Sequence, residues 1–173
     1  MTEELLCFAR GENSFNFENI SLKDFFEEIE MILGVETDRL KINLKVSYDQ
    51  NIDIKMDKDK VMRLIFNLTN NALEILKEGD TISILSKVLP DNTIEIRVQD
   101  SGPGIPDFLK ATLFDAFVTH GKKKGTGLGL HISKEIAKGH GGGLSLDESY
   151  DKGACFVITL DPNPVLARLP ESA

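Results

Sequence analysis

The sequence predicts an α+β fold built as a two-layer sandwich, and three features of the chain carry this prediction. Its 173 residues suffice for one domain with its own core, because a chain near this length buries roughly 70% of its unfolded surface. Apolar residues make up 41% of the chain, which is too many for a disordered protein. The expected strands and helices follow one another without regular strand–helix–strand alternation, and this disfavours a doubly wound sheet.

Each element is predicted from the spacing of its apolar residues, which recur every three or four positions in helices and alternate in strands. Ser21 and Asp24 form an N-terminal capping pair for the first helix, and Gly79 ends the second. Pro90–Asn92 turn the chain between two strands and so predict a hairpin. The predicted helices are 21–34, 58–77 and 127–138, and the predicted strands are 41–48, 52–56, 81–88, 93–99, 143–148 and 154–160.

The folded domain is expected to cover residues 19–162. Residues 1–18 start with a helical pattern and then become rich in Gly, Asn and Ser. We expect them to be the end of an upstream helical segment followed by a linker. Residues 163–173 contain two of the last three prolines and are expected to form a tail.

Charge and composition exclude several function classes. The chain carries 28 acidic and 20 basic residues, a formal charge of −8, whereas a nucleic-acid-binding domain carries a basic face. No apolar run is long enough to cross a membrane. A secretory signal has a basic start followed by an apolar run, whereas acidic residues follow Met1 in this chain. Cys7 and Cys155 form no metal-binding or redox motif, so both are expected to be reduced thiols of a cytosolic protein.

Two amides on the central predicted helix form the first candidate site. Asn67 and Asn71 lie four residues apart at the edge of the apolar stripe, where a pocket wall would be, while Asn70 points toward solvent. An amide oxygen can coordinate a cation, and an amide nitrogen can donate to a phosphate. Two asparagines at this spacing are more often ordinary polar residues at the edge of a core, so by themselves they do not establish a site.

Asp100 and the glycines after it form the second candidate site. The apolar residues of strand 93–99 face one side, and Asp100 continues in that phase, which predicts a buried carboxylate in need of a donor. Gly102 and Gly104 permit the close approach of a flat ligand, and the amino group of adenine is a suitable donor. The alternative is a simple turn formed by Asp-Ser-Gly.

The third candidate site is the glycine-rich start of the last predicted helix. Gly125, Gly127 and Gly129 leave backbone N–H groups exposed at the positive end of the helix dipole, which favours phosphate. Lys122–Lys124 precede them and add positive charge, although such a run is also typical of a solvated loop. The spacing is not that of a Walker A loop. No strand–helix–strand unit surrounds it, and this disfavours a dinucleotide-binding fold.

Taken in order, four segments resemble the N, G1, F and G2 boxes of histidine kinase catalytic domains, which belong to the ATPase superfamily shared with gyrase and MutL. The resemblance covers about residues 20–161. It implies a Bergerat-type ATP-binding fold, in which helices on one face of a mixed, mostly antiparallel sheet hold ATP. The segments are RLIFNLTNNALEIL (63–76), DSGPGI (100–105), LFDAF (113–117) and GTGLGL (125–130).

The resemblance also implies a role for each matched residue. Asn71 would coordinate Mg²⁺, and Asn67 would support the metal and phosphates as the other member of the catalytic pair. Asp100 would accept from the adenine amino group, and Phe114 and Phe117 would anchor a mobile lid. The remaining implied nucleotide contacts, besides Phe117 itself, are Gly102, Gly104, Ile105, Lys122, Lys123, Lys124, Gly125, Thr126, Gly127, Leu128 and Gly129.

Three positions depart from or specialise the family pattern. Glu74 stands where a basic residue often touches phosphate, and Thr119 stands where many members have Arg. Lys122–Lys124 would supply the positive charge that these two positions lack. Asn67 stands where the water-splitting members have a glutamate that acts as general base. Because an amide cannot accept that proton at neutral pH, the resemblance implies a poor ATPase suited to transferring the γ-phosphoryl group to a protein.

The implied protein is thus the ATP- and Mg²⁺-binding catalytic domain of a cytoplasmic sensor histidine kinase. Its expected partners are an upstream dimerisation and phosphoacceptor domain and the receiver domain of a response regulator. His120, His131 and His140 lack the sequence context of an acceptor, so the phosphorylated histidine is expected outside this chain. Two alternatives remain: a degenerate module that uses ATP occupancy as a conformational signal, and an anti-sigma-type serine kinase.

Overall fold

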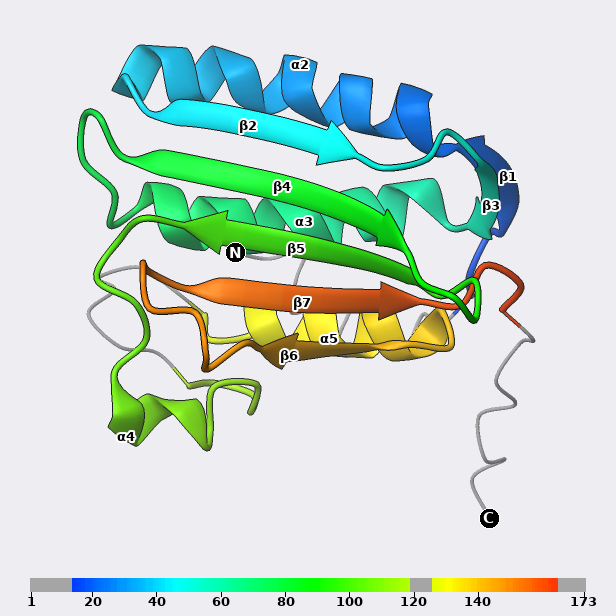
Figure 1. The fold of residues 1–173 in the computed structure, drawn as a ribbon. Helices are drawn as coiled ribbons and strands as arrows, with labels where there is room; N and C mark the ends of the chain where they lie inside the picture. The colour runs from blue at the N-terminus through cyan, green and yellow to red at the C-terminus, as the bar shows by residue number, and fades with distance from the viewer. Residues whose placement is uncertain (1–13, 119–125, 165–173) are drawn as a thin grey trace.

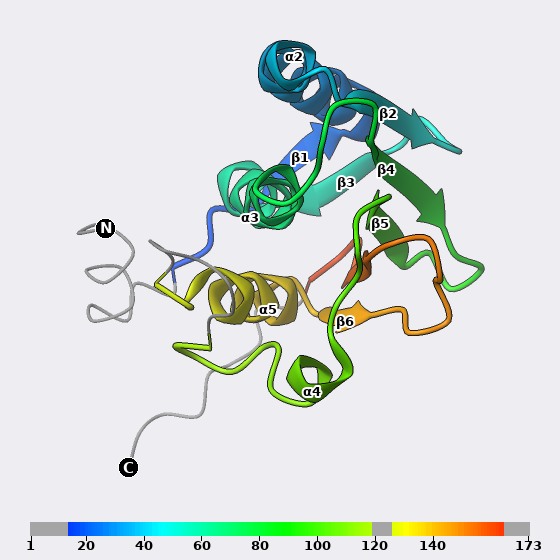
Figure 2. The same cartoon turned by 90° about the vertical axis from the view of Figure 1, so that its left-hand side faces the viewer.

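The computed structural model describes residues 14–118 and 126–164, and in it helices cover one face of a five-stranded sheet (Figure 1). The strand order is β2-β4-β5-β7-β6, in which β2 and β4 are parallel and every other pair is antiparallel. Figure 2 shows α2, α3 and α5 on the same side of this sheet. The strands are β1 (Glu18–Ser21), β2 (Asn43–Tyr48), β3 (Asp53–Met56), β4 (Thr81–Val88), β5 (Ile94–Asp100), β6 (Gly143–Leu146) and β7 (Cys155–Leu160), and the helices are α2 (Leu22–Leu40), α3 (Lys58–Leu73), α4 (Asp107–Lys110) and α5 (Gly129–Gly139). The predicted two-layer α+β sandwich with a mixed, mostly antiparallel sheet is therefore confirmed.

Helix α2 begins as predicted and ends later than predicted. Ser21 caps it, because its Oγ accepts the Asp24 N–H at 3.3 Å. The predicted end at residue 34 is wrong: the helix continues through Gly34 to Leu40. Leu33 and the buried Thr37 extend the face that packs on the core, and this packing outweighs the cost of about 1 kcal/mol for a glycine inside a helix.

A second, two-stranded sheet pairs β1 with β3 in antiparallel register. Strand β3 was predicted, whereas β1 falls at the junction between the expected linker and the first helix. Four residues with one apolar side chain, Ile20, give no alternation from which a strand could be predicted. Its pairing with β3, with Ile20 opposite Ile54, comes from tertiary contact.

Helix α3 is shorter than predicted at its carboxyl end. Asp57 caps its start through an Oδ1 that accepts the Lys60 N–H at 3.0 Å, and the helix ends at Leu73 instead of 77. The prediction that Ile75 belongs to the buried stripe is wrong, since this side chain is 45% exposed. The last turn tightens there, because the N–H groups of Ile75 and Leu76 both donate to the Ala72 carbonyl.

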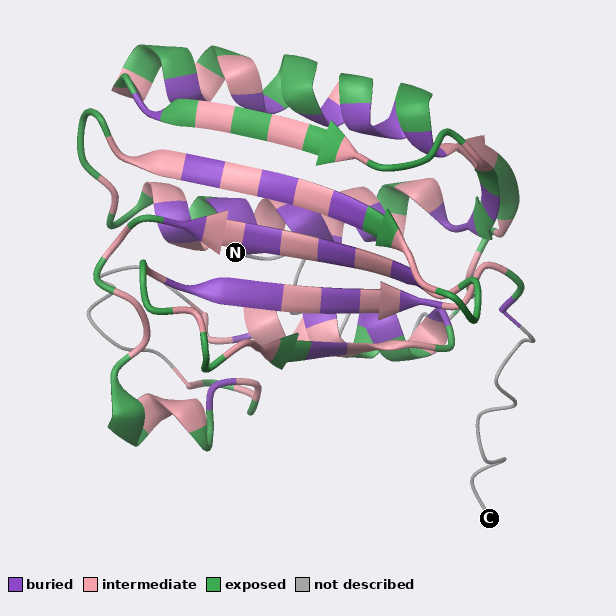
Figure 3. Cartoon of the chain, in the orientation of Figure 1, coloured by how far each residue is buried: buried purple, intermediate pink, exposed green. Residues whose placement is uncertain are grey.

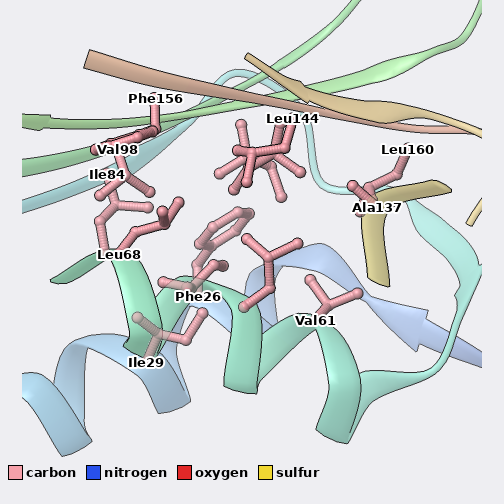
Figure 4. Packing of buried hydrophobic residues seen from close by; sticks show 14 of the residues in the cluster. Phe26, Ile29, Val61, Leu68, Ile84, Val98, Ala137, Leu144, Phe156 and Leu160 are labelled. Atoms are coloured by element: carbon pink, nitrogen blue, oxygen red, sulfur yellow. The ribbon is translucent and has the colours of Figure 1, made fainter. Parts of the chain in front are cut away.

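The core lies between the sheet and the three long helices. Figure 3 shows the alternation of buried and less buried residues along β4 and β5, and Figure 4 shows helix side chains meeting those of the sheet. Each fully buried aliphatic or aromatic side chain contributes about 1.5–3 kcal/mol relative to an exposed one. The largest buried side chains from the helices are Leu22, Phe25, Phe26, Ile29, Leu64, Ile65 and Leu68, and those from the strands include Ile54, Met56, Ile82, Ile84 and Ile94.

Two further expectations concern single features. Cys155 is a buried free thiol, and Cys7 lies outside the described residues. Among the helices that the structure describes, none combines the length and the apolar character needed to span a membrane.

Candidate functional site

Asn67 connects the two helices that carry the candidate residues. Its Nδ2 donates to the Gly129 carbonyl and to Ser133 Oγ, both at 3.3 Å, so α3 meets α5 at this amide. Asn71 follows one turn later on α3 and is half-buried, while Asn70 is exposed as predicted. The structure thus brings Asn67 to the glycine-rich start of α5, with Asn71 one turn further along α3.

The N-terminus of α5 is built to present backbone donors. Its N-cap residue, Leu128, has no side-chain acceptor, and the helix begins at Gly129 instead of the predicted 127. Gly127 has a φ of 69°, a left-handed conformation that glycine adopts without strain, and this turns the chain into the helix. First-turn N–H groups without a side-chain cap, at the positive end of the dipole, form a site that favours phosphate.

Asp100 is buried at the end of β5, as its strand phase predicts. It is 6% exposed, and its Oδ1 accepts the backbone N–H groups of Gly102 at 2.9 Å and Ala154 at 3.1 Å. Burial raises the pKa of Asp100 above the ordinary carboxyl value, although both backbone bonds oppose the shift. Neither bond uses Oδ2, so this oxygen can accept from a ligand.

Apolar side chains from the turn that follows α3 lie beside this carboxylate. A Cβ on Gly102 would come within 3.1 Å of Leu76 Cδ2 and 3.6 Å of Ile75 Cδ1, besides 3.0 Å from Asp100 Oδ1. The exposed Ile75 therefore borders the Asp100 site, and a glycine at 102 leaves room between them. A flat ring that donates to Asp100 would contact this apolar edge.

Gly153 is a site residue that the sequence interpretation missed. A Cβ at this position would lie 2.1 Å from the Asp100 carbonyl oxygen and 2.7 Å from Oδ1, and its φ is 155°. Only glycine lets the start of β7 approach closely enough for the Ala154 N–H to reach Asp100. The sequence showed Asp151–Gly153 only as a turn, because nothing in it indicates that β7 lies next to β5.

A cavity of about 220 Å³ adjoins the same loop from the side of β6 and α4. It shares Gly102, Gly104 and Gly153 with the surroundings of Asp100, but no residue of α3 or α5 lines it. The cavity therefore does not contain the asparagine pair, and it neighbours the candidate site without being its centre.

The F-box segment is joined to the glycine-rich segment by backbone contacts. The Phe117 N–H donates to the Gly127 carbonyl at 2.9 Å, and a Cβ on Gly127 would lie 2.5 Å from the Phe117 carbonyl carbon. Phe117 has a φ of 68°, which is rare for a bulky residue. The ring of Phe114 packs edge-on against Phe156, and its carbonyl lies 3.2 Å from His131 Nδ1.

The other predicted contact residues are placed as follows. Ile105 is half-buried against the core, Gly104 has a φ of 75°, and Thr126 Oγ1 accepts the Leu128 N–H at 3.4 Å. Thr119, His120, Lys122, Lys123, Lys124 and Gly125 lie outside the described residues.

The protein ligands available at this site suit a metal ion that binds together with an anionic ligand. Within residues 14–118 and 126–164, no group of three or more His, Cys, Asp or Glu could hold a metal ion. Asn71 offers a single neutral amide oxygen from α3, and Mg²⁺ takes about six oxygen ligands and usually binds through one or two protein groups plus phosphates and water. Asn71 therefore fits Mg²⁺ only where phosphate oxygens complete the coordination.

Comparison with known proteins agrees with this geometry. The family described as histidine kinase-, DNA gyrase B- and HSP90-like ATPases matches residues 56–164, which include both asparagines, Asp100 and the glycine-rich start of α5. The chain belongs to this family. It is an ATP-binding catalytic domain of the histidine kinase type, as the resemblance implied.

Relatives of this catalytic domain include named kinases and a solved structure. The domain is 30% identical to sporulation kinase A of Bacillus subtilis over 157 residues, and 32% identical to the sensor histidine kinase ZraS of Salmonella typhimurium over 170 residues. These alignments cover 90% and 97% of this chain but 26% and 35% of the relatives. The nucleotide-free catalytic domain of histidine kinase ThkA superposes with a TM-score of 0.78 at 27% identity, covering 87% of this chain and 98% of that one.

Proposed function

We propose that this catalytic domain binds ATP with Mg²⁺ and transfers the γ-phosphoryl group to a histidine on a separate phosphoacceptor domain. The observation that carries the proposal is that an amide, Asn67, meets the N-terminus of α5. A carboxylate there could take a proton from water, whereas an amide cannot, so hydrolysis is disfavoured and transfer to a protein nucleophile is favoured.

Each part of the site has a proposed task. Asp100 Oδ2 accepts a hydrogen bond from the adenine amino group, and Ile75 contacts the face or edge of the base. The first turn of α5, from Gly129, donates to phosphate oxygens, and Lys122–Lys124 add positive charge.

Asn71 is proposed to hold Mg²⁺, and Asn67 keeps α3 and α5 in register. When bound, Mg²⁺ neutralises phosphate charge and orients the phosphates. In the transfer the bond from the γ-phosphorus to the bridging β-oxygen breaks, a phosphorus–nitrogen bond to the acceptor imidazole forms, and ADP leaves.

The partners are proposed by analogy with two-component systems. ThkA, which shares the fold at a TM-score of 0.79 and 24% identity, has been solved in complex with the response regulator protein TrrA. By the same logic, an upstream dimerisation and phosphoacceptor domain receives the phosphoryl group here, and a receiver domain takes it onward in the cytoplasm.

Phosphotransfer is tested by incubating the full-length parent and the isolated chain with γ-labelled ATP. We expect acid-labile, base-stable label on the parent, as a phosphohistidine gives, and little single-turnover hydrolysis by the isolated chain. Rapid metal-dependent hydrolysis by the isolated chain would contradict the role given to Asn67. Tight ATP binding without any label would instead favour the degenerate module, which the acidic Glu74 keeps open.

Replacing Asn71 with alanine is expected to abolish the dependence of nucleotide affinity on Mg²⁺, because the only proposed protein ligand of the metal is lost. Calorimetric titration with ATP, with and without Mg²⁺, measures this. Asn70→Ala is the matched control, since Asn70 is the adjacent, exposed amide on the same helix. Equal responses of the two variants to Mg²⁺ would rule out Asn71 as the metal ligand.

A further inference from the structure

The four residues before β1 pack on the domain at the opposite end of α5 from the candidate site. We call residues 14–17 the strap. The ring of Phe15 lies directly on Gly139, so that a Cβ on this glycine would be 2.0 Å from Phe15 Cζ. The Asn16 N–H donates to Asp57 Oδ2 at 2.9 Å, and Lys60 Nζ lies 5.0 Å from the centroid of the Phe15 ring. The strap thus contacts both α5 and the start of α3.

His140 is the central contact of the strap. Its ring is fully buried, and the rings of Phe15 and Phe17 meet it edge-on with centroids 5.2 Å away in each case. Nε2 accepts the Asp57 N–H at 3.0 Å, so Nδ1 carries the proton and donates to the Ile136 carbonyl at 2.8 Å. Burial lowers the pKa of His140, which keeps this neutral form. One imidazole therefore joins the strap, the N-cap of α3 and the last turn of α5.

Both helices that the strap contacts run on to the candidate site. Helix α5 extends from Gly139 back to Gly129, about 16 Å, and α3 extends from its cap at Asp57 to the asparagine pair. At the far end the two helices are joined by the Asn67 bonds, which at 3.3 Å are long for hydrogen bonds. The two helices therefore connect the strap to the place where phosphate is proposed to bind.

We propose that the strap is a clasp that sets the packing of α5 on α3, so that its release weakens nucleotide binding at the other end of these helices. Phe15 and Phe17 act as positioning residues. The effect on binding rests on the proposed ATP site, whereas the packing of the strap does not.

A double-mutant cycle between Phe15 and Gly139 tests the packing. Gly139 is the last residue of α5 and has no positive φ, so alanine there is intrinsically favoured by at most about 1 kcal/mol, the value for a helix interior. Because a methyl group would overlap the Phe15 ring, we expect Gly139→Ala to destabilise the wild type and to be neutral or stabilising in the Phe15→Ala background. A stabilising effect of Gly139→Ala in the wild type would show that the strap does not pack there and would overturn the proposal.

Amide hydrogen exchange and nucleotide titration test the coupling in the same variants. We expect Phe15→Ala and Gly139→Ala to speed exchange of the Asn16 amide and of the Ile132 amide, which donates to Leu128 at the start of α5. ATP affinity should fall by roughly fivefold or more, the lower end of typical couplings between sites. Met31→Ala, which truncates a 70% exposed side chain on α2, is the matched control and should change neither.

The two proposals fail in different ways. Suppose that Phe15→Ala and Gly139→Ala speed exchange of the Asn16 amide but leave Ile132 exchange and ATP affinity as they are in the Met31→Ala control. The coupling between the strap and the nucleotide site is then overturned. If the unaltered chain binds no ATP, the proposed function fails, and the exchange of Ile132 alone decides whether the strap controls α5. The Phe15→Ala/Gly139→Ala double variant should match Phe15→Ala in exchange and in ATP affinity, because both changes release the same strap, and effects that add up would overturn the clasp.

Discussion

Asp100→Asn is expected to weaken ATP binding by roughly 10- to 100-fold while leaving the fold at least as stable. An asparagine Oδ1 can still accept the N–H groups of Gly102 and Ala154, which turns its Nδ2 toward the ligand. Two donors, this amide and the adenine amino group, then face each other in a buried site, and neither is satisfied. Stability is kept because the substitution removes a carboxylate whose raised pKa shows the cost of its burial.

Calorimetric titration with ATP and ITP separates this explanation from a general loss of binding. Hypoxanthine carries a carbonyl oxygen where adenine carries the amino group, so the variant should shift in preference toward ITP. Asp53→Asn, an exposed carboxylate on β3, is the control for the loss of one negative charge. Unchanged ATP affinity in Asp100→Asn would remove this residue from the nucleotide site.

The raised pKa of Asp100 also gives a pH dependence with a definite sign. The buried carboxyl group binds a proton more readily in the folded than in the unfolded chain, so its contribution to stability falls as the pH rises through its folded-state pKa. ATP binding should change in the opposite sense and weaken as the pH falls through the same interval, because the carboxyl group loses its charge. The variant Asp100→Asn should show neither contribution when unfolding and binding are measured across this range.

Gly142→Ala is expected to lower the free energy of unfolding by about 3 kcal/mol, at the upper end of typical overpacking costs. A Cβ at this position would lie 1.8 Å from the Thr159 carbonyl oxygen and 3.0 Å from the Leu160 nitrogen, both of which are β7 backbone that cannot rotate away. For a chain of 173 residues this corresponds to a fall in Tm of about 6–12 °C. Thermal unfolding followed by circular dichroism measures it.

The next residue provides the control. A Cβ on Gly143 meets only Thr159 Oγ1, at 3.9 Å, which is an ordinary contact. Gly143→Ala should therefore be neutral or slightly stabilising, since alanine in a strand avoids the entropic cost of glycine. Equal losses in the two variants would mean that strand propensity, and not the approach of β7, decides the stability at this corner.

Local pattern was sufficient to predict most elements of the sheet and the phase of Asp100. Alternation in 81–88 and 93–99 predicted the hairpin of β4 and β5, and continuing that alternation placed Asp100 on the buried face. These features depend only on the two-residue period of a strand, which can be recognised from residues adjacent in the sequence. The ends of α2 and α3 were wrong because helix ends depend on packing: Thr37 prolongs one helix, and the turn at Ile75 ends the other.

By itself, the sequence determined the fold class, the burial of Asp100 and, through four ordered motifs, the candidate nucleotide site. Only the tertiary structure decided which distant backbones meet there. Gly153 must be glycine because β7 passes against Asp100, and Phe15 packs on Gly139 because β1 pairs with β3 and directs the strap to α5. A residue's periodicity is a property of its own segment, whereas the space available at its Cβ is set by a segment far away in the chain.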